Sequence, residues 1–406
     1  MGSCSVIAAL QRQWRELLQR LTRVPDPWLL LPVLALLSIG LVMVTSASLS
    51  FAADRFNNPL LFMRSHLLYL LLGGVALLLG WSVDSQFWAA RSRLWLLLGL
   101  LLMLLIMLPG IGYSANGATR WLRLGGFTVQ IAELVKIALI VYLAAWLQRY
   151  RELFIQAPQV AWQPVLVVAL FAALLLAQPD FGSVVVIVAS SAALLFIGGL
   201  QLRWLLVSAA LLAALGFFLV AEQSYRLARI TAYLDPWADQ FSSGYQLTQS
   251  LIAFGRGEWF GVGLGQSLQK MLYLPEAHTD FVFAIYAEEF GFVGVVVLVA
   301  LFALLVGRLL QLGYRALALS QWYLGFMLIG FGVMLAGQSF INLGVNAGLL
   351  PTKGLTLPFV SFGGSSLIVS MAMAGLWLAA ARELAAVSGI ARSPRRGLSA
   401  VRGSYV

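Results

Sequence analysis

Long apolar runs separated by short polar segments recur along the whole chain. Runs of about 20 apolar residues are long enough to cross the roughly 30 Å core of a bilayer as helices. The pattern predicts ten spans, at Trp28–Ser50, Leu61–Ser82, Leu94–Gly112, Ile131–Trp146, Pro164–Gln178, Ser183–Leu200, Trp204–Glu222, Phe281–Val306, Trp322–Leu343 and Val360–Ala381. We therefore expect an all-α polytopic membrane protein with ten transmembrane helices.

The polar segments divide this pattern into five parts. We expect an N-terminal cytoplasmic segment over residues 1–27, helices one to seven over 28–222, a large extracytoplasmic loop over 223–280, helices eight to ten over 281–381, and a basic cytoplasmic tail over 382–406. The loop between helices seven and eight is long and rich in aromatic residues, and it contains an amphipathic segment around Tyr245–Phe254. Long loops of this kind are usually structured and functional.

The positions of Lys and Arg predict the orientation in the membrane. The side that holds both termini carries 16 of them and the opposite side carries 9. Cytoplasmic loops retain an excess of Lys and Arg, so both termini are predicted to be cytoplasmic. Nothing after the first apolar run resembles a small-residue cleavage site, so the first helix is predicted to be retained.

Composition narrows the classes of function. Of the residues, 61% are hydrophobic and 10% are charged, which is far from the soluble globular range. The positive-inside bias explains the net charge of +10 better than nucleic-acid binding does. One cysteine, Cys4, and two histidines, His66 and His278, leave no room for a disulfide framework and little for a Cys- or His-built metal site.

The predicted cytoplasmic loops are too short to hold a nucleotide-binding domain. The chain contains no GxxxxGK[ST] loop, and Gly261-Val262-Gly263-Leu264-Gly265 follows no βαβ pattern. We expect neither a nucleotide nor a haem. Any enzymatic chemistry should therefore lie on the extracytoplasmic side, where most motif-like residues occur.

The most informative polar cluster opens the predicted eighth helix. It reads Leu274-Pro275-Glu276-Ala277-His278-Thr279-Asp280, with Lys270 before it and Glu288-Glu289 about two turns into the helix. Charge at the mouth of a membrane helix is costly and usually functional, and partial desolvation can tune the proton affinity of Asp280. Asp280 is the candidate catalytic base. The alternative is that Asp280 only caps the helix.

Two further charged groups have both a structural and a functional interpretation. Glu133 and Lys136 share one face of the predicted fourth helix, either as an internal ion pair or as part of an outward-facing polar cavity where Lys136 meets phosphate. Arg120, in Asn116-Gly117-Ala118-Thr119-Arg120-Trp121, is either an interfacial anchor or a ligand for the substrate. Asp180, after Pro179, is expected to cap the next helix.

The last predicted outer loop offers anion-binding groups. Lys353, in Leu350-Pro351-Thr352-Lys353-Gly354-Leu355-Thr356-Leu357-Pro358, is a candidate pyrophosphate ligand. The following Ser361-Phe362-Gly363-Gly364-Ser365-Ser366 offers close backbone approach and free N–H groups at a helix start. Ser365 is therefore a candidate substrate-binding residue.

Taken together, these motifs resemble the SEDS family of peptidoglycan glycan polymerases, which serve shape, elongation, division and sporulation. The resemblance extends from Val44-Thr45-Ser46-Ala47-Ser48 to Ser361–Ser366, and Gly244-Tyr245-Gln246-Leu247-Thr248-Gln249-Ser250-Leu251 is most similar to the members that act in cell division. One departure occurs: where the family often has Gln-Pro-Ser-Glu or Gln-Pro-Ala-Glu, this chain reads Gln130-Ile131-Ala132-Glu133.

The resemblance implies a ten-span fold, lipid II as the substrate and Asp280 as the essential carboxylate. It also implies a septal location in the cell inner membrane, a class B penicillin-binding protein as partner, and divisome regulators. In this interpretation Asp280 is the general base of an inverting transfer, and Lys353, Lys136 or Arg120 stabilises the leaving pyrophosphate. Mg²⁺ or Mn²⁺ suits the same oxygen-rich chemistry. The alternatives are a lipid II flippase and a non-catalytic divisome scaffold.

Overall fold

Apolar helices of membrane length dominate the computed structural model, which describes residues 26–115, 118–125, 127–204, 206–207, 233–238, 240–242, 244–352 and 354–392. Seven of the described helices are long and apolar enough to cross a membrane, and two shorter apolar helices accompany them. The predicted all-α membrane architecture is thereby confirmed. The predicted seventh span, Trp204–Glu222, lies outside the described residues except for its first few positions. The tail beyond Arg392 lies wholly outside them.

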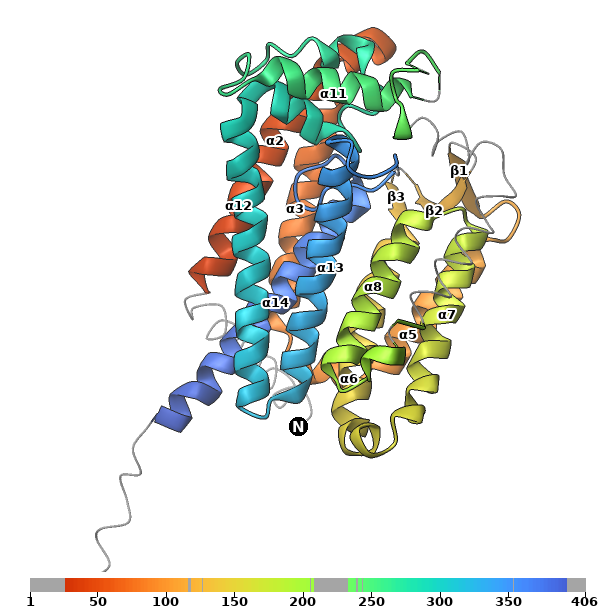
Figure 1. Ribbon diagram of the computed structural model, residues 1–406, viewed down its shortest axis with the longest axis vertical. Helices are drawn as coiled ribbons and strands as arrows, with labels where there is room; N and C mark the ends of the chain where they lie inside the picture. Colours follow the sequence, from red (N-terminus) through yellow and green to blue (C-terminus); the bar gives the residue numbers. More distant parts are fainter. Residues whose placement is uncertain are drawn as a thin grey trace, which may run out of the picture.

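The helices form one bundle, and different elements lie at its two ends (Figure 1). Its helices are α2 (Pro27–Phe56), α3 (Leu61–Ser82), α4 (Ser85–Ala90), α5 (Ser92–Ile106), α6 (Ile131–Gln156), α7 (Trp162–Ala177), α8 (Phe181–Ile197), α11 (Tyr245–Gly257), α12 (Val282–Ala318), α13 (Trp322–Asn346) and α14 (Gly364–Arg392). The short turns η1 (Pro158–Ala161) and η2 (Gln269–Tyr273) complete the helical elements. One end carries α11 and a small sheet, and α2 begins and α14 ends near the other.

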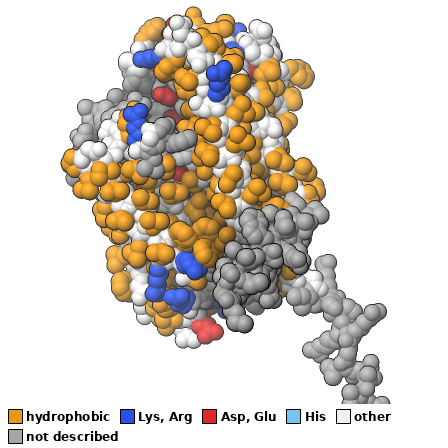
Figure 2. Space-filling model, turned by 180° about the vertical axis from the view of Figure 1, so that it is seen from behind, with side chains coloured by type: hydrophobic (Ala, Val, Ile, Leu, Met, Phe, Trp, Pro, Cys, Tyr) orange, Lys and Arg blue, Asp and Glu red, His pale blue; other side chains and the backbone are white. Residues whose placement is uncertain are grey.

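The core lies where α3 packs along α14 and where α12, α13 and α6 pack side by side. The largest buried side chain there is Trp377 of α14. Hydrophobic side chains also cover much of the described part of the face shown in Figure 2. Exposed apolar residues such as Leu71, Leu97 and Leu101 are about 60–70% accessible in the isolated chain, as expected of a surface that faces lipid.

Polar residues fix where several of these helices begin. Asp26 accepts a hydrogen bond from the backbone N–H of Trp28 and caps α2. Asp180 accepts from the N–H of Ser183 at 3.2 Å and caps α8, which confirms the capping interpretation of that residue. Ile131 occupies the first position of α6, so this helix begins at the predicted residue.

The predicted outer loop over residues 113–130 is a three-stranded antiparallel sheet. Its strands are β1 (Gly112–Ala115), β2 (Ala118–Leu124) and β3 (Phe127–Gln130), in the order β1-β2-β3. The third span was predicted to reach Gly112, but α5 ends at Ile106. The Pro109-Gly110 turn, in which Gly110 has φ 86°, redirects the chain into β1.

The predicted eighth span is longer than expected and is broken near its start. α12 runs from Val282 to Ala318, and Gly291 adopts φ 66° and ψ −165° within it. The N–H groups of Val262 and Gly263 donate to the carbonyls of Glu288 and Glu289, and the N–H of Phe292 donates to Glu258. The Gly261–Gly265 motif therefore lies against a break in a helix, where it satisfies backbone groups.

Two further boundaries differ from the sequence-based expectation. The amphipathic segment around Tyr245–Phe254 forms α11, which extends to Gly257. The last helix begins at Gly364, four residues later than predicted, and continues to Arg392 into the segment assigned to the tail. The Gly363-Gly364 pair delays its start, because glycine is a weak helix former.

Candidate functional site

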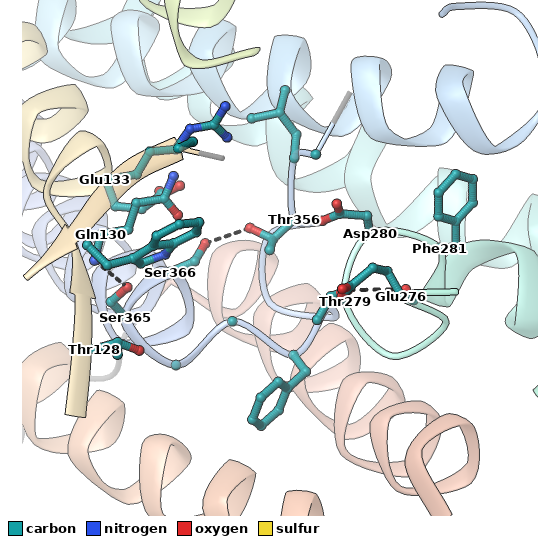
Figure 3. A pocket seen from close by; sticks show the side chains of 18 of the residues that line it. Thr128, Gln130, Glu133, Glu276, Thr279, Asp280, Phe281, Thr356, Ser365 and Ser366 are labelled. Carbon is teal, nitrogen blue, oxygen red and sulfur yellow. Dashed lines mark hydrogen bonds between the residues drawn. The ribbon is translucent and has the colours of Figure 1, made fainter. Parts of the chain in front are cut away.

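A polar cavity of about 410 Å³ lies at the end of the bundle that carries α11 and the sheet. Its walls come from β2, β3, the start of α6, the turn before α12, the α13–α14 loop and the start of α14 (Figure 3). The polar and charged residues that line it are Arg120, Thr128, Gln130, Glu133, Gln246, Glu276, Thr279, Asp280, Thr352, Thr356, Ser365 and Ser366. Segments far apart in sequence thus converge on one volume, as in a ligand site.

Asp280 lies in the wall of this cavity, in a turn that its neighbours hold. The hydroxyl of Thr279 donates to the Glu276 carboxylate at 2.6 Å, and the N–H of Phe281 donates to the Glu276 carbonyl at 3.2 Å. The residue that caps α12 is Phe281, with no side-chain capping hydrogen bond. The alternative in which Asp280 only caps this helix is therefore wrong.

The surroundings of Asp280 favour a proton acceptor that works near neutral pH. Burial, followed by the like charge of Glu276, raises the pKa of Asp280 from 3.8 to about 7. The positive charge of Arg120 opposes this rise, and Asp180 adds to it. A base with a pKa near the working pH combines an available unprotonated form with useful basicity.

Backbone groups surround the Asp280 side chain closely. A Cβ built on Gly354 would lie 2.9 Å from Oδ2 of Asp280, so this loop approaches the carboxylate at a distance that only glycine allows. In Figure 3 Asp280 reaches toward Thr356, which lies between it and Ser366. Lys353, the predicted pyrophosphate ligand, immediately precedes Gly354 and lies outside the described residues.

Arg120 binds the turn between α7 and α8, and its predicted role as a substrate ligand stays a prediction. It is on β2 and lines the cavity. Its Nε donates to the carbonyl of Gln178 at 3.1 Å, and its Nη2 donates to the carbonyl of Pro179. These carbonyls follow the C-terminal end of α7, where a cation is favourable. Arg120 therefore fixes the α7–α8 turn while contributing positive charge to the cavity.

Glu133 and Lys136 form the internal ion pair that was one of the two predictions for them. Nζ of Lys136 lies 2.9 Å from Oε1 of Glu133, and Lys136 is 1% exposed. Nζ also donates to Gln338 at 2.7 Å, and Gln338 donates to the carbonyl of Thr356. Glu133 lines the cavity and Lys136 does not, so in this conformation the lysine supports the cavity wall from behind.

The start of α14 lies in the wall of the same cavity, and the anion-binding role of the Gly-Ser segment stays a prediction. Gly363, Gly364, Ser365 and Ser366 all line the cavity. Oγ of Ser365 accepts a hydrogen bond from the N–H of Gln130 at 3.0 Å, and the hydroxyls of Ser366 and Thr356 lie 2.9 Å apart. The positive end of the dipole of a 29-residue helix therefore lies at the same cavity as Asp280.

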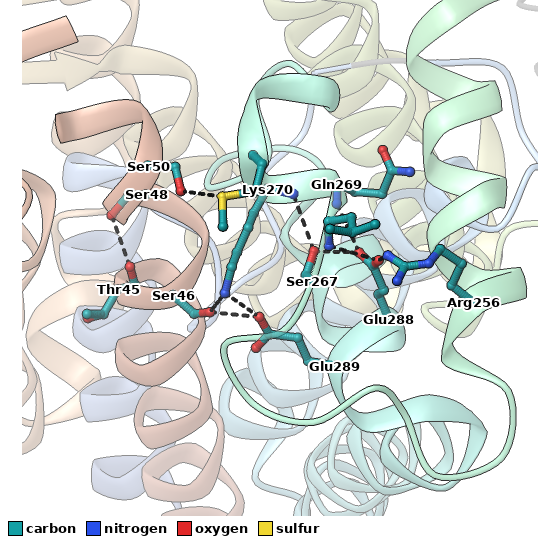
Figure 4. Close-up of polar contacts among 12 residues, drawn as sticks. Thr45, Ser46, Ser48, Ser50, Arg256, Ser267, Gln269, Lys270, Glu288 and Glu289 are labelled. Atoms are coloured by element: carbon teal, nitrogen blue, oxygen red, sulfur yellow. Dashed lines mark hydrogen bonds and ion pairs between the residues drawn. The ribbon is translucent and has the colours of Figure 1, made fainter. Parts of the chain in front are cut away.

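The remaining charges near Asp280 in sequence form a separate cluster (Figure 4). Glu288 pairs with Arg256 and accepts from the N–H groups of Leu268 and Gln269. Glu289 pairs with Lys270 at 2.8 Å and accepts from Ser46 of α2. The expectation that Lys270 and both glutamates belong with Asp280 is wrong, because their charges are neutralised among themselves and hold the outer loop against α12 and α2.

The part of the chain that the structure describes contains no preformed set of metal ligands. No group of three or more His, Cys, Asp or Glu side chains is arranged to hold an ion there. Asp280 and Glu276 are the two acidic groups at the turn before α12, and Glu133 is already paired with Lys136. A role for Mg²⁺ or Mn²⁺ stays a prediction.

Comparisons with known proteins agree with this geometry. A protein of Legionella pneumophila named "Probable peptidoglycan glycosyltransferase FtsW" is 45% identical over 353 residues, which cover 87% of this chain and 90% of the relative. A chain from the solved structure of a peptidoglycan synthase complex matches with a TM-score of 0.72 and 33% identity, over 89% of this chain and 98% of that one. The Thermus thermophilus rod shape determining protein RodA matches with a TM-score of 0.67 and 30% identity, over the same shares.

The family assignment follows from a match along most of the chain. The sequence profile that unites FtsW, RodA and SpoVE, described as cell cycle proteins, matches residues 27–386. That range contains every wall of the cavity, from β2 to the start of α14. The chain is a member of the FtsW/RodA/SpoVE family, as the sequence motifs predicted.

Proposed function

We propose that this multi-pass membrane protein is a peptidoglycan glycosyltransferase that polymerises the disaccharide units of lipid II and releases undecaprenyl pyrophosphate. The relative from Legionella pneumophila is named as such a transferase. The observation that carries the proposal here is the placement of Asp280. Its carboxylate lies in a polar cavity, with a pKa raised to about 7, together with the start of α14 and its anion-binding groups.

The proposed reaction is a direct displacement at the anomeric carbon of the donor. Asp280 removes the proton from the 4-hydroxyl of the acceptor disaccharide, and the oxygen attacks the anomeric carbon while the bond to the pyrophosphate oxygen breaks. An α-linked donor then gives a β-linked product with inversion. General base catalysis of this kind contributes about 10²–10⁴-fold. No general acid is needed, because pyrophosphate is already an acidic leaving group.

The leaving pyrophosphate requires positive charge and hydrogen-bond donors. The N–H groups at the start of α14 and the Ser365 hydroxyl offer them within the cavity, and Arg120 adds a positive charge. Lys353 belongs to the loop that approaches Asp280, and we keep it as a ligand for the pyrophosphate. Lys136 contributes indirectly through Glu133 unless it exchanges partners when the substrate binds.

The biological setting is proposed from the relatives. The matched chain comes from a peptidoglycan synthase complex that coordinates polymerization and crosslinking, which supports a class B penicillin-binding protein as the proposed crosslinking partner. The FtsW names of the relatives support a proposed location at the division septum of the inner membrane, with divisome proteins as proposed regulators. The excess of Lys and Arg on the side of both termini supports a cytoplasmic location for them, and in that orientation the cavity would face the periplasm.

Two alternative functions make different demands on the site. A lipid II flippase would also use a polar cavity, but it has no need of a base whose pKa is near neutral. A non-catalytic scaffold is compatible with the buried Glu288 and Glu289, because their ion pairs give both residues a structural role. A scaffold does not require the carboxylate of Asp280 in the cavity.

The deciding experiment is polymerisation of lipid II by the purified protein with its partner. We expect Asp280→Asn to abolish glycan strands, while Asp54→Asn, which removes an exposed carboxylate from α2, leaves them unchanged. Asp280→Asn with wild-type activity would refute the proposal. Absence of strands from the wild type, together with lipid II movement in liposomes, would favour a flippase.

A further inference from the structure

Two asparagines of α13 donate hydrogen bonds to the backbone carbonyl of Asp280. Nδ2 of Asn342 donates to the Asp280 carbonyl at 3.0 Å, and Nδ2 of Asn346 donates to the same carbonyl at 2.9 Å. A carbonyl oxygen has two lone pairs, so both are occupied. The two asparagines lie one helical turn apart and are 2% and 0% exposed, so water does not compete for these hydrogen bonds.

Each asparagine joins Asp280 to a second part of the site. Oδ1 of Asn346 accepts from the N–H of Ala284 in the first turn of α12 at 3.1 Å. Nδ2 of Asn342 also donates to the carbonyl of Leu355, which lies in the opposite wall of the cavity. One amide thus fixes Asp280 relative to α12, and the other fixes it relative to the α13–α14 loop.

The two asparagine side chains carry an energetic cost, which indicates that their N–H donors have a role at this position. The contacts of both Nδ2 atoms are carbonyl oxygens, which only accept, so the orientation of the amides is determined by chemistry. Oδ1 of Asn342 is then buried without a partner among the described residues. A buried unpaired acceptor is unfavourable, and an apolar residue of similar size would avoid it.

We propose that Asn342 and Asn346 are positioning residues that hold Asp280 in its productive place in the cavity. This inference rests on the proposed function, because it assigns a catalytic use to the position of Asp280. The Asp280 side chain has no hydrogen-bond donor among the described residues, so its backbone and the packing around it determine where the carboxylate lies. Misplacement of a reacting group by about 1 Å can lower a rate about 10²-fold.

The test compares Asn346→Leu with Ser339→Ala on the same helix. Ser339 is 3% exposed, and its hydroxyl has no partner within the described residues, so its removal deletes a buried polar group without touching Asp280. We expect Asn346→Leu to lower kcat for lipid II polymerisation about 10²-fold, with KM changed by less than about threefold. Ser339→Ala should keep the wild-type kcat.

The pH profile separates positioning from a general loss of folded protein. A carboxylate released from its buried position moves toward water, so the acid limb of the Asn346→Leu profile should move to lower pH. A smaller amount of correctly folded enzyme would lower kcat without moving that limb. An unmoved limb, or a wild-type kcat, overturns the inference.

Two further variants make the result interpretable. If Asn346→Leu does not fold, Asn342→Leu tests the same carbonyl, with the same expected loss of kcat and shift of the acid limb. Asp280→Asn is measured beside them. An inactive Asp280→Asn with a fully active asparagine variant refutes the positioning role alone, whereas an active Asp280→Asn refutes the proposed function.

Discussion

Replacing Glu276 by glutamine should move the pH dependence of the reaction without removing the base. Glu276 lines the same cavity as Asp280 and is the first charged group, after burial itself, that raises its pKa. Glutamine keeps a side-chain oxygen that can accept the hydrogen bond now donated by Thr279. The substitution therefore removes a negative charge while leaving the turn before α12 intact.

The expected size of the effect follows from the charge interaction. One unit charge acting across a partly solvated cavity is worth about 1.4 kcal/mol, which corresponds to about one pH unit. The pKa of Asp280 is about 7 in the wild type. At pH 6 about a tenth of the molecules then carry the unprotonated base, and about half do so in Glu276→Gln. The variant should be about fivefold more active at pH 6 and equally active at pH 8.5.

The assay is the initial rate of lipid II polymerisation between pH 5 and pH 9. Because the base works in its unprotonated form, kcat should rise with pH through about 7 in the wild type and through a lower pH in the variant. Glu152→Gln, which removes an exposed acid near the opposite end of α6, is the matched control and should follow the wild-type curve. An acid limb that stays in place or moves to higher pH would show that Glu276 does not set the proton affinity of Asp280.

Four other outcomes can be measured independently. Asp280→Asn should raise the melting temperature by an amount that corresponds to about 1–3 kcal/mol at pH 8, with no gain below pH 4, because a carboxylate with a raised pKa loses stability as pH rises through about 7. Gly354→Ala should lower kcat at least tenfold with the melting temperature nearly unchanged, since its Cβ would lie 2.9 Å from Oδ2 of Asp280. Lys270→Met should cost about 3–5 kcal/mol in stability by leaving Glu289 buried and unpaired, and adding Glu289→Leu should restore most of it in the same thermal unfolding assay. Gly291→Ala should lower the melting temperature by an amount that corresponds to 1 kcal/mol or more, because its φ is 66° and an added Cβ would lie 2.3 Å from the N–H nitrogen of Gly261.

Hydropathy predicted the helices well and their ends less well. Apolar length is enough to place α3 and α13, which begin at the predicted residues. It fails where a helix continues beyond the apolar run, as at the end of α14, and where a Pro-Gly turn ends one early, as after α5. The sheet over β1–β3 was missed because its strands are short and lie in a segment assigned to a loop.

Local sequence identified the Asp280 turn but not what holds it. Glu276, Thr279 and Asp280 are neighbours in the chain, so their proximity was visible from the start. Asn342 and Asn346 lie more than 60 residues away, and no local rule connects them to Asp280. Their spacing of four residues in an otherwise apolar span was a signal, since polar residues inside a membrane helix usually face a partner.

Asp280 differs from the fully buried acidic residues of the described chain in what neutralises its charge. The fully buried ones, Glu133, Asp180, Glu288 and Glu289, each have an ion-pair partner or a hydrogen-bond donor within the protein. Asp280 is partly buried and has neither among the described residues, while its pKa is raised by burial. A carboxylate that the fold leaves unsatisfied at the edge of a cavity is available to bind a proton from outside the protein. Asp280 and Glu288 lie close together in the sequence, but only Asp280 has carboxylate oxygens without a hydrogen-bond donor among the described residues, and this difference supports Asp280 as the proposed base.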